Sequence, residues 1–205
     1  MVFDGGDFTG AGFSGGTISF YNARFSGEEV GFYDVEFSGG TFDFSGAVFS
    51  DTVDFSGAVF SGGAVSFGFS VFSGGTVDFT GALFSGGTVR FGNARFSGGT
   101  VLFSGAQFSG SEVGFCDARF SGTEYFFDLS RFSAGTVDFT GTQFSGGTVD
   151  FLTAQFSGGE VDFSGVDDWS SPPAFSWGRI GKPPLGVKLP KEDQTGGQEQ
   201  TPTGR

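Results

Sequence analysis

Aspartate recurs in this sequence at a fixed place in a repeated run. It ends Gly-Thr-Val-Asp runs, for example at Asp78 and Asp150. Paired carboxylates serve in general acid–base catalysis, and glycine-rich runs with aspartate bind calcium in nonapeptide repeats. Here the third glycine of that calcium motif is absent, the aspartate comes one residue early, and the period is 12 residues. These differences argue against a calcium site.

The other residues that commonly do chemistry are scarce. The chain of 205 residues has no histidine and a single cysteine, Cys116. It therefore lacks the parts of a Ser-His-Asp or Cys-His nucleophile system, an internal disulfide and a thiolate zinc site. The Ser-Gly-Gly runs have no lysine or helix pattern after them, so they do not fit phosphate-binding loops. We expect no enzyme, no catalytic residue, no cofactor and no metal site, with Cys116 an outward-facing, incidental thiol.

Phenylalanine sets a period that any fold must accommodate. The chain has 40 glycines and 32 phenylalanines. Of the phenylalanines, 28 follow one pattern, in which the steps from Phe13 to Phe163 alternate seven and five, with one step of six between Phe49 and Phe55. The consensus F-S-G-G-T-V-D-F-S-G-A-x repeats every 12 residues. A repeat this regular indicates a solenoid and argues against a disordered low-complexity chain.

Within each repeat the residues alternate as in a short strand. The residue two before a phenylalanine is usually valine or alanine, and the residue between them is usually polar, as in Val77-Asp78-Phe79. Positions i and i+2 of a strand point to the same side, so valine, alanine and phenylalanine face inward. Ser-Gly follows and predicts a corner. Short sides that end in corners predict a coil whose turns stack by parallel pairing.

These residues carry a family resemblance. The A-x-F-S-G unit at 106–110 resembles the pentapeptide repeat, and the resemblance extends over about residues 3 to 165. The chain is most similar to the FSGGTVDFSGA-type members found in actinobacteria. The resemblance implies an all-β fold, a right-handed quadrilateral β-solenoid with one repeat per side. Every second unit here carries two extra residues, such as Gly75 and Thr76.

The extra residues leave two coil sizes open. Two modules in one coil give about 6.5 coils of 24 residues between Phe8 and Phe163. One module in each coil gives a narrow 12-residue solenoid. We favour 24 residues, because that coil encloses four phenylalanines, two valines and two alanines, whereas the narrow coil leaves little room beside two facing rings. The wide coil places Val48 next to Val71, and Val59 next to Leu83, on opposite faces, whereas the narrow coil places all four in one row.

The chain divides into three predicted segments. Residues 3–165 form the solenoid, residues 166–191 form an aromatic and proline-rich C-terminal cap, and residues 192–205 form a disordered tail. The cap contains Trp169 and Trp177, the two tryptophans of the chain; a binding site that uses these two rings is the alternative. No run of apolar residues is long enough to span a bilayer, and no signal peptide begins the sequence. We expect a cytoplasmic protein.

Charge is concentrated on the predicted solenoid. Residues 1–165 hold 18 acidic and five basic residues, whereas residues 166–205 are balanced, and the net charge is −13. On a 24-residue coil, Asp54, Asp78 and Asp150 share a column that Leu102 and Phe126 interrupt. A second column holds Asp138 and Asp162. Such acidic columns indicate either a solvated surface or an acidic rod similar to duplex nucleic acid.

Three functions are compatible with this pattern. The first is a non-catalytic structural scaffold or protein-interaction module with an unknown protein partner. The second follows from the resemblance, because some pentapeptide-repeat proteins mimic DNA and bind a type II topoisomerase, DNA gyrase. Ice or crystal-surface binding is least favoured, because glutamates such as Glu112 and Glu124 interrupt the threonine rows. We expect no direct nucleic-acid binding, no membrane span, and a monomer or weak homo-oligomer.

Overall fold

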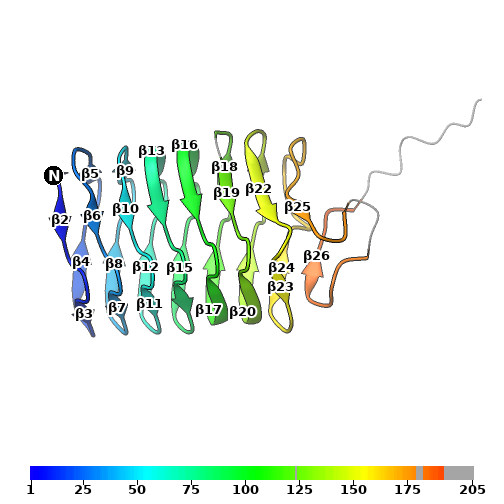
Figure 1. Cartoon of the computed structure of the whole chain (residues 1–205), viewed down its shortest axis with the longest axis horizontal. Coiled ribbons are helices and arrows are strands. Elements are labelled where there is room, and N and C mark those ends of the chain that lie inside the picture. Colours follow the sequence, from blue (N-terminus) through cyan, green and yellow to red (C-terminus); the bar gives the residue numbers. More distant parts are fainter. Residues whose placement is uncertain (123, 179–181, 192–205) are drawn as a thin grey trace, which may run out of the picture.

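The chain folds into a rod of stacked strands. The structure, a computed structural model, describes residues 1–122, 124–178 and 182–191, and all regular secondary structure in these ranges is β-strand (Figure 1). The tail predicted for residues 192–205 lies outside the described residues. The N-terminus lies at one end of the rod, and β26 (Val187–Lys188) lies near the other.

Four columns of parallel strands form the sides of the rod, and we number them face 1 to face 4 in the order in which the chain visits them. Face 1 contains β1 (Val2–Phe3), β5 (Arg24–Phe25), β9 (Val48–Phe49), the starts of β13 (Val71–Asp78) and β16 (Arg95–Leu102), β18 (Arg119–Phe120) and β21 (Gln143–Phe144). Face 2 contains β2 (Gly6–Asp7), β6 (Val30–Gly31), β10 (Val53–Asp54), the ends of β13 and β16, β19 (Glu124–Phe126), β22 (Thr148–Phe151) and β25 (Ala174–Phe175). Face 3 contains β3 (Gly12–Phe13), β7 (Glu36–Phe37), β11 (Val59–Phe60), β14 (Leu83–Phe84), the starts of β17 (Gln107–Gly114) and β20 (Arg131–Asp138), and β23 (Gln155–Phe156). Face 4 contains β4 (Thr17–Ser19), β8 (Thr41–Asp43), β12 (Ala64–Ser66), β15 (Thr88–Arg90), the ends of β17 and β20, β24 (Glu160–Asp162) and β26.

The strand register confirms the wide coil. Residues 24 positions apart pair in adjacent coils, as Arg95 pairs with Arg119. Val48 pairs with Val71 on face 1, and Val59 pairs with Leu83 on face 3. The predicted two columns on opposite sides are therefore confirmed, and the 12-residue coil is excluded because Val48 and Val59 belong to different sheets.

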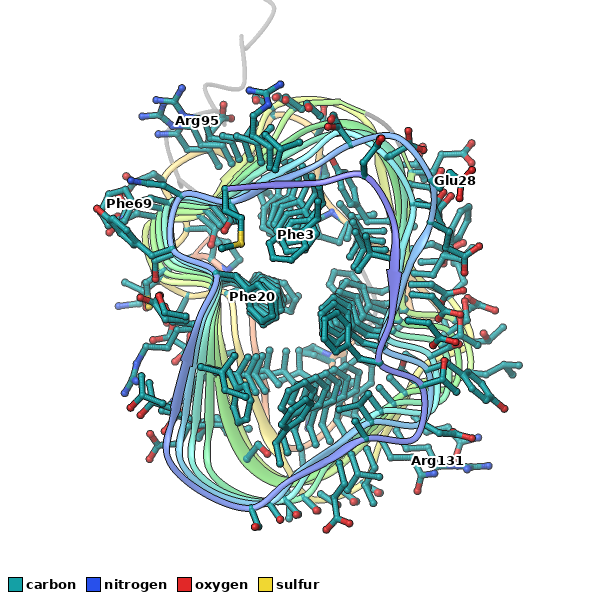
Figure 2. All side chains as sticks on the ribbon, turned by 90° about the vertical axis from the view of Figure 1, so that its left-hand side faces the viewer. Phe3, Phe20, Glu28, Phe69, Arg95 and Arg131 are labelled. Carbon is teal, nitrogen blue, oxygen red and sulfur yellow. The ribbon has the colours of Figure 1, made fainter. Side chains whose placement is uncertain are left out.

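The coil is right-handed, as the resemblance implied. Figure 2 looks along the rod from its N-terminal end, and the chain runs clockwise from Phe20 past the column of Arg95 to Glu28 as it recedes. The strand path from β1 to β25 has eight members. The stack thus extends beyond the 6.5 coils counted between Phe8 and Phe163, through β1 at one end and β25 and β26 at the other.

One coil is a residue shorter than its neighbours, and a corner absorbs the difference. Phe49 pairs with Phe72, 23 positions further on, whereas Phe72 pairs with Phe96, 24 positions further on. The shorter coil contains the shortened corner at Asp51. Its carboxylate accepts hydrogen bonds from the backbone N–H of Gly27 (3.3 Å) and of Thr52 (3.1 Å). The inward register continues unchanged, because the missing residue belongs to a corner and not to a strand.

Two kinds of corner join the faces. At the Phe-Ser-Gly-Ala corner, Ala47 donates its backbone N–H to the carbonyl oxygen of Phe44 at 3.0 Å, and Gly46 has a φ of 69°. This geometry is typical of a β-turn that requires a positive φ at its third residue. At the Ser-Gly-Gly corner, Gly87 also has a φ of 69°, and a Cβ atom there would lie 2.5 Å from the carbonyl oxygen of Gly63. Two independent reasons therefore favour glycine at this position of the second corner. Its backbone has a positive φ, and the adjacent coil leaves no room for a side chain.

Inward side chains fill the rod with the predicted composition. One coil contributes a fully buried set of four phenylalanines, two valines and two alanines: Val77, Phe79, Ala82, Phe84, Val89, Phe91, Ala94 and Phe96. Phe91 stacks on Phe67 and on Phe115 with ring centroids 4.8 Å apart, and it meets Phe79 edge-on at 6.0 Å. Stacked and edge-on pairs are the favourable arrangements of aromatic rings, so the interior is a packed core without a channel.

A few polar side chains enter the core in the alanine and valine columns, which the repeat pattern alone did not reveal. Ser70, Ser130 and Thr142 replace alanine, and each donates its hydroxyl to a phenylalanine carbonyl oxygen of the preceding coil, at 2.7, 2.5 and 2.9 Å. Tyr125 replaces valine and donates its hydroxyl to the carbonyl oxygen of Phe96 at 2.7 Å. Each of these hydroxyls has a hydrogen-bond acceptor in the core, which removes most of the cost of burying it.

Aromatic rings of the C-terminal segment cover the last coil. Trp169 packs edge-on against Phe144 at 5.5 Å, and Trp177 packs edge-on against Phe156 at 5.5 Å. Phe175 stacks on Trp177 at 4.6 Å. An aromatic layer thus takes the place of a further coil. The division at 165/166 and 191/192 stays a proposal.

Candidate interaction surfaces

The outward side chains of the solenoid are the candidates for binding, because the described core is filled by packed side chains. The register confirms both predicted acidic columns. On face 2, Asp54 pairs with Asp78, and Leu102 and Phe126 then separate Asp78 from Asp150. On face 4, Asp138 pairs with Asp162.

The aspartates of these columns also stabilise the corners, a role that the 12-residue period does not predict. The carboxylates of Asp54, Asp78, Asp138 and Asp162 each accept a hydrogen bond from the backbone N–H two residues later, at 2.7, 2.7, 2.8 and 2.8 Å. A short polar side chain that binds its own backbone in this way stabilises a turn. The Asp-Phe-Ser-Gly spacing could have indicated it. The acidity of the columns therefore has a structural reason besides any binding role.

These local hydrogen bonds change the titration of some carboxyl groups. The hydrogen bonds that the side chain and backbone of Thr9 donate lower the pKa of Asp7 below its usual value. Burial acts to raise the pKa of Asp162, but the hydrogen bonds from Ser164 and Lys188 outweigh it and lower that pKa. Lys188 is 2.6 Å from Glu160 and 3.2 Å from Asp162, and these contacts raise the pKa of the lysine.

Face 1 differs from the other faces in charge. Along its described strands the outward residues include three arginines and no acidic residue, in the order Val2, Arg24, Val48, Val71, Arg95, Arg119, Gln143. An isolated bridge then adds Asp168 to this column, next to Gln143. The three arginines are exposed, and none of them forms an ion pair with a described residue. The rod is therefore acidic overall with one basic side, a polarity that the net charge does not reveal.

A shallow pit lies on face 4 where Gly114 replaces a larger side chain. Gly114 lies in register between Arg90 and Asp138, and the pit has a volume of about 250 Å³. Cys116 borders it and donates to Asp138 at 3.4 Å. Burial, followed by the charge of Asp138, raises the pKa of the thiol, so the thiol stays protonated at neutral pH and is a poor nucleophile. Cys116 is half-buried, less outward than predicted.

A larger hollow of about 550 Å³ lies in the C-terminal segment. Its lining is mainly apolar and includes Trp169, Pro172, Phe175, Leu189 and Pro190. The tryptophan-based binding site remains the alternative to a pure cap at this place. Nothing among the described residues shows what fills the hollow, and we assign it no ligand.

Within the described ranges, no cluster of three or more Asp, Glu or Cys side chains is arranged to hold a metal ion. The same part of the chain contains no helix long and apolar enough to cross a membrane.

The fold and its surfaces define a class. A right-handed, four-sided parallel β-solenoid with a phenylalanine core carries its variable side chains on the outside. Comparison with known proteins agrees: residues 44–89 match the family model described as pentapeptide repeats (9 copies). In its recurring unit, its four-sided coil and this match the chain is similar to proteins of the pentapeptide-repeat family.

Other comparisons add little about function. No curated protein matches the chain. Among solved structures, a trypsin-treated form of QnrB1, a plasmid-mediated fluoroquinolone resistance protein, is 19% identical with a TM-score of 0.23, over 93% of this chain and 87% of that one. A second trypsin-treated form is 17% identical with a TM-score of 0.20, over 91% and 92% of the two chains. The full-length form is 16% identical with a TM-score of 0.19, over 93% and 94%. With TM-scores below 0.5, these likenesses say nothing about what the present chain binds.

Proposed function

We propose that this chain is a non-catalytic scaffold that binds protein partners through the outer faces of its solenoid. The observation that carries the proposal is the contrast between a uniform inside and a varied outside. The inward columns repeat phenylalanine, valine and alanine, whereas the outward column of face 1 changes from valine to arginine to glutamine. A rigid ladder that presents different side chains at fixed spacing is typical of repeat proteins that bind other proteins.

The core supports the same conclusion. Its side chains are packed against one another, so a substrate would have to bind on the outside. The pit on face 4 is shallow and its thiol is held protonated. Catalytic sites usually lie in deeper hollows that exclude water from the reacting groups. A cytoplasmic location and a monomeric or weakly oligomeric state stay predictions.

Site-specific photo-cross-linking tests the scaffold function face by face. A benzophenone amino acid is placed at one exposed position on each face: Arg119, Thr148, Gln107 and Thr136 for faces 1 to 4. The four variants are irradiated in cells that produce the chain, and the adducts are identified by mass spectrometry. We expect one foreign protein to be cross-linked from one or two faces only. Uniform adducts from all four faces, or none, would refute a specific scaffold.

The alternative function is an acidic DNA mimic that binds DNA gyrase. The net charge of −13 favours it. Two observations count against it: the arginines of face 1 break the acidic surface, and the column aspartates are engaged by backbone N–H groups of the corners. A mimic of duplex DNA needs negative charge on the faces that its partner protein contacts.

A supercoiling assay with purified DNA gyrase decides this alternative. Inhibition at protein concentrations comparable to that of the enzyme, relieved by added salt, would support the mimic. Unchanged supercoiling at a large excess of the chain would reject it and leave the general scaffold function in place.

A further inference from the structure

Two bulky apolar side chains are exposed at corners and do not contribute to the core of the solenoid. Phe69 and Leu129 occupy the same position of the repeat, a corner position that holds glycine in half of the modules and asparagine or aspartate in four others. Their φ angles are 59° and 55°, a conformation that glycine adopts freely and that bulky side chains avoid. Their exposed fractions are 67% and 60%. Each residue strains the backbone and places apolar surface in water, and such outliers point to a function.

Leu129 belongs to a cluster that we call the aspartate-rimmed patch, defined as Leu102, Phe126, Leu129 and Leu152. Leu102 and Phe126 are neighbours in register on face 2, in the column that elsewhere holds aspartate. Leu129 lies at the following corner, where its N–H donates to the hydroxyl of Thr153, the residue after Leu152. Four departures from the repeat thus gather in adjacent coils, and all four are apolar.

The rim of this patch is acidic. Asp78 pairs with Leu102 at one end of the face 2 column, and Asp150 pairs with Phe126 at the other. Asp128 precedes Leu129 and accepts a hydrogen bond from Ser104. One arginine, Arg131, lies two residues after Leu129 on face 3.

Phe69 belongs to a second cluster, the arginine-rimmed patch, defined as Val48, Phe69 and Val71. Val48 and Val71 are neighbours in register on face 1, and only the inward-facing Ser70 separates Phe69 from Val71. Arg24 pairs with Val48 and Arg95 pairs with Val71, so that an arginine lies at each end of the valine pair. Apolar patches with a polar rim are typical of protein-binding surfaces.

The charges of the two patches are complementary. On face 4, Ser66 pairs with Arg90 and with Asp43, so a third arginine and one aspartate lie near Phe69. Three arginines and one aspartate therefore surround the arginine-rimmed patch. Three aspartates and one arginine surround the aspartate-rimmed patch. In both patches the same coil rise sets the spacing between the charges, as the stacked rings of Phe67 and Phe91, 4.8 Å apart, show for one step of the rod.

We propose that copies of this chain associate side by side, with the arginine-rimmed patch of one copy against the aspartate-rimmed patch of the next. The apolar centres exclude water from the contact, and the rims select the orientation. The two patches lie on opposite corners of the rod, as Figure 2 shows by Phe69 at the left and Arg131, near Leu129, at the lower right. The contact joins unlike surfaces, so each added copy leaves one patch of each kind free.

The resulting array is open and staggered. Phe69 and Leu129 are 60 positions apart, which corresponds to two and a half coils, or roughly 12 Å along the rod. The net charge of −13 opposes association at low salt. At about 0.15 M salt the screening length is about 8 Å. Salt therefore weakens the long-range repulsion between two copies more than it weakens the attraction between opposite charges in direct contact. We therefore expect weak, concentration-dependent association at that ionic strength.

Two variants test the contact without damaging the fold. Phe69→Gly and Leu129→Gly restore the glycine of the repeat at a positive φ, so both should fold at least as stably as the parent chain. In sedimentation velocity at about 0.15 M salt, the parent chain should show a sedimentation coefficient that keeps rising with concentration. Each variant alone should remain a monomer over the same series.

A mixture of the two variants gives the sharpest result. Phe69→Gly keeps the aspartate-rimmed patch and Leu129→Gly keeps the arginine-rimmed patch, so the equimolar mixture should form a dimer and nothing larger. Asn22→Gly is the matched control, since it removes an exposed side chain at the same corner position, with a φ of 54°, and should associate like the parent.

Several outcomes would overturn the proposal. They are a parent chain that stays monomeric up to about 0.5 mM, single variants that associate like the parent, or a mixture without the dimer. The inference goes beyond the scaffold function, and its failure leaves the cross-linking experiment with a foreign partner unaffected.

Discussion

The contribution of a phenylalanine to this rod depends on which side of the strand it occupies. Phe91 is fully buried between the rings of Phe67 and Phe115, whereas Phe69 is mostly exposed. Phe42 replaces valine inside the core, and Phe126 replaces aspartate outside it. Residue type alone therefore does not decide burial here, and the position within the repeat does.

Truncation of two phenylalanines measures this difference. Phe91→Ala should lower the free energy of unfolding by about 3–5 kcal/mol, because it removes a ring from the packed column and leaves a cavity. Phe69→Ala should change it by less than about 0.5 kcal/mol. Urea denaturation followed by circular dichroism gives both values. Equal effects of the two substitutions would contradict the inward register.

Acidic pH should destabilise the protein through specific carboxyl groups. Asp162 has a pKa lowered from 3.8 in the folded state, so its contribution to stability is present above that value and is lost as the pH falls through the folded pKa. Asp7 and Asp168 shift in the same direction. Melting temperatures should be nearly constant from pH 7 down to about pH 4 and should then fall. Asp162→Asn should make this fall less steep, and an unchanged slope would contradict the role of Asp162.

At the residue scale, the repeat predicted the inward side chains but not their polar exceptions. Valine, alanine and phenylalanine alternate with outward residues, and this pattern was sufficient to place Phe91 in the core. The hydroxyl of Ser70 bonds to a carbonyl oxygen 26 residues away, in the preceding coil. A period in one sequence does not show which backbone atom faces a given side chain, so the repeat could not predict this contact.

Corners, rather than strands, place the strictest demands on residue type in this coil. Many of the strands are only two residues long, so the direction of the chain changes after almost every pair of inward residues. Gly81 and Gly87 have nearly the same φ, 68° and 69°, at the two kinds of corner. A Cβ atom on Gly81 would meet no atom within 4 Å, whereas one on Gly87 would clash with the backbone of the adjacent coil.

Alanine at these two glycines separates conformational strain from steric overlap. Gly81→Ala should cost about 1–2 kcal/mol, because alanine disfavours the left-handed conformation. Gly87→Ala should cost distinctly more, because the coil spacing must also increase. Thermal denaturation of both variants checks the order. A smaller loss for Gly87→Ala than for Gly81→Ala would contradict the close approach of Gly87 to Gly63.

Among the elements of the coil, the Ser-Gly pairs predicted the corners correctly. The hydrogen bonds from the corner backbone to the aspartates could not be predicted from the repeat. The alternation with inward neighbours predicts that Asp54 and Asp78 are surface charges, because the residue between two inward strand residues points to solvent. They do point outward, but each carboxylate turns back to the corner two residues later. Local hydrogen bonds of this kind depend on the corner geometry, which the period does not specify.

The stability of the whole rod should depend on what covers its last coil. Trp169 and Trp177 pack on the terminal rings of Phe144 and Phe156. The double variant Trp169→Ala and Trp177→Ala should therefore unfold first at residues 139–163, and the exposed strand edges should promote association end to end. Hydrogen exchange with mass spectrometry reports the local loss of protection. Unchanged protection and an unchanged monomer would contradict the covering role of the two rings.

For the molecule as a whole, the size of the coil followed from packing arguments. Four phenylalanines with their valines and alanines fill a 24-residue coil, and the register confirmed that choice. The basic side of the rod was harder to anticipate. Arg24, Arg95 and Arg119 are far apart in the sequence, and they share face 1 only because the two kinds of corner alternate.

A coil built from two equivalent 12-residue modules constrains how a gene for this rod can change its length. Replication errors at a repeated DNA sequence add or remove whole modules. Loss of one module would preserve the core, because valine, alanine and phenylalanine return to the inside half a coil later. It would also rotate everything downstream by half a turn, so that residues now on face 2 would come to lie in line with the upstream part of face 4. Arg119 would then leave the column of Arg24 and Arg95. Such a protein would still fold, but the side chains of its outer faces would no longer line up between the upstream and downstream parts. Proteins that keep the same outer surfaces should therefore gain or lose modules in pairs.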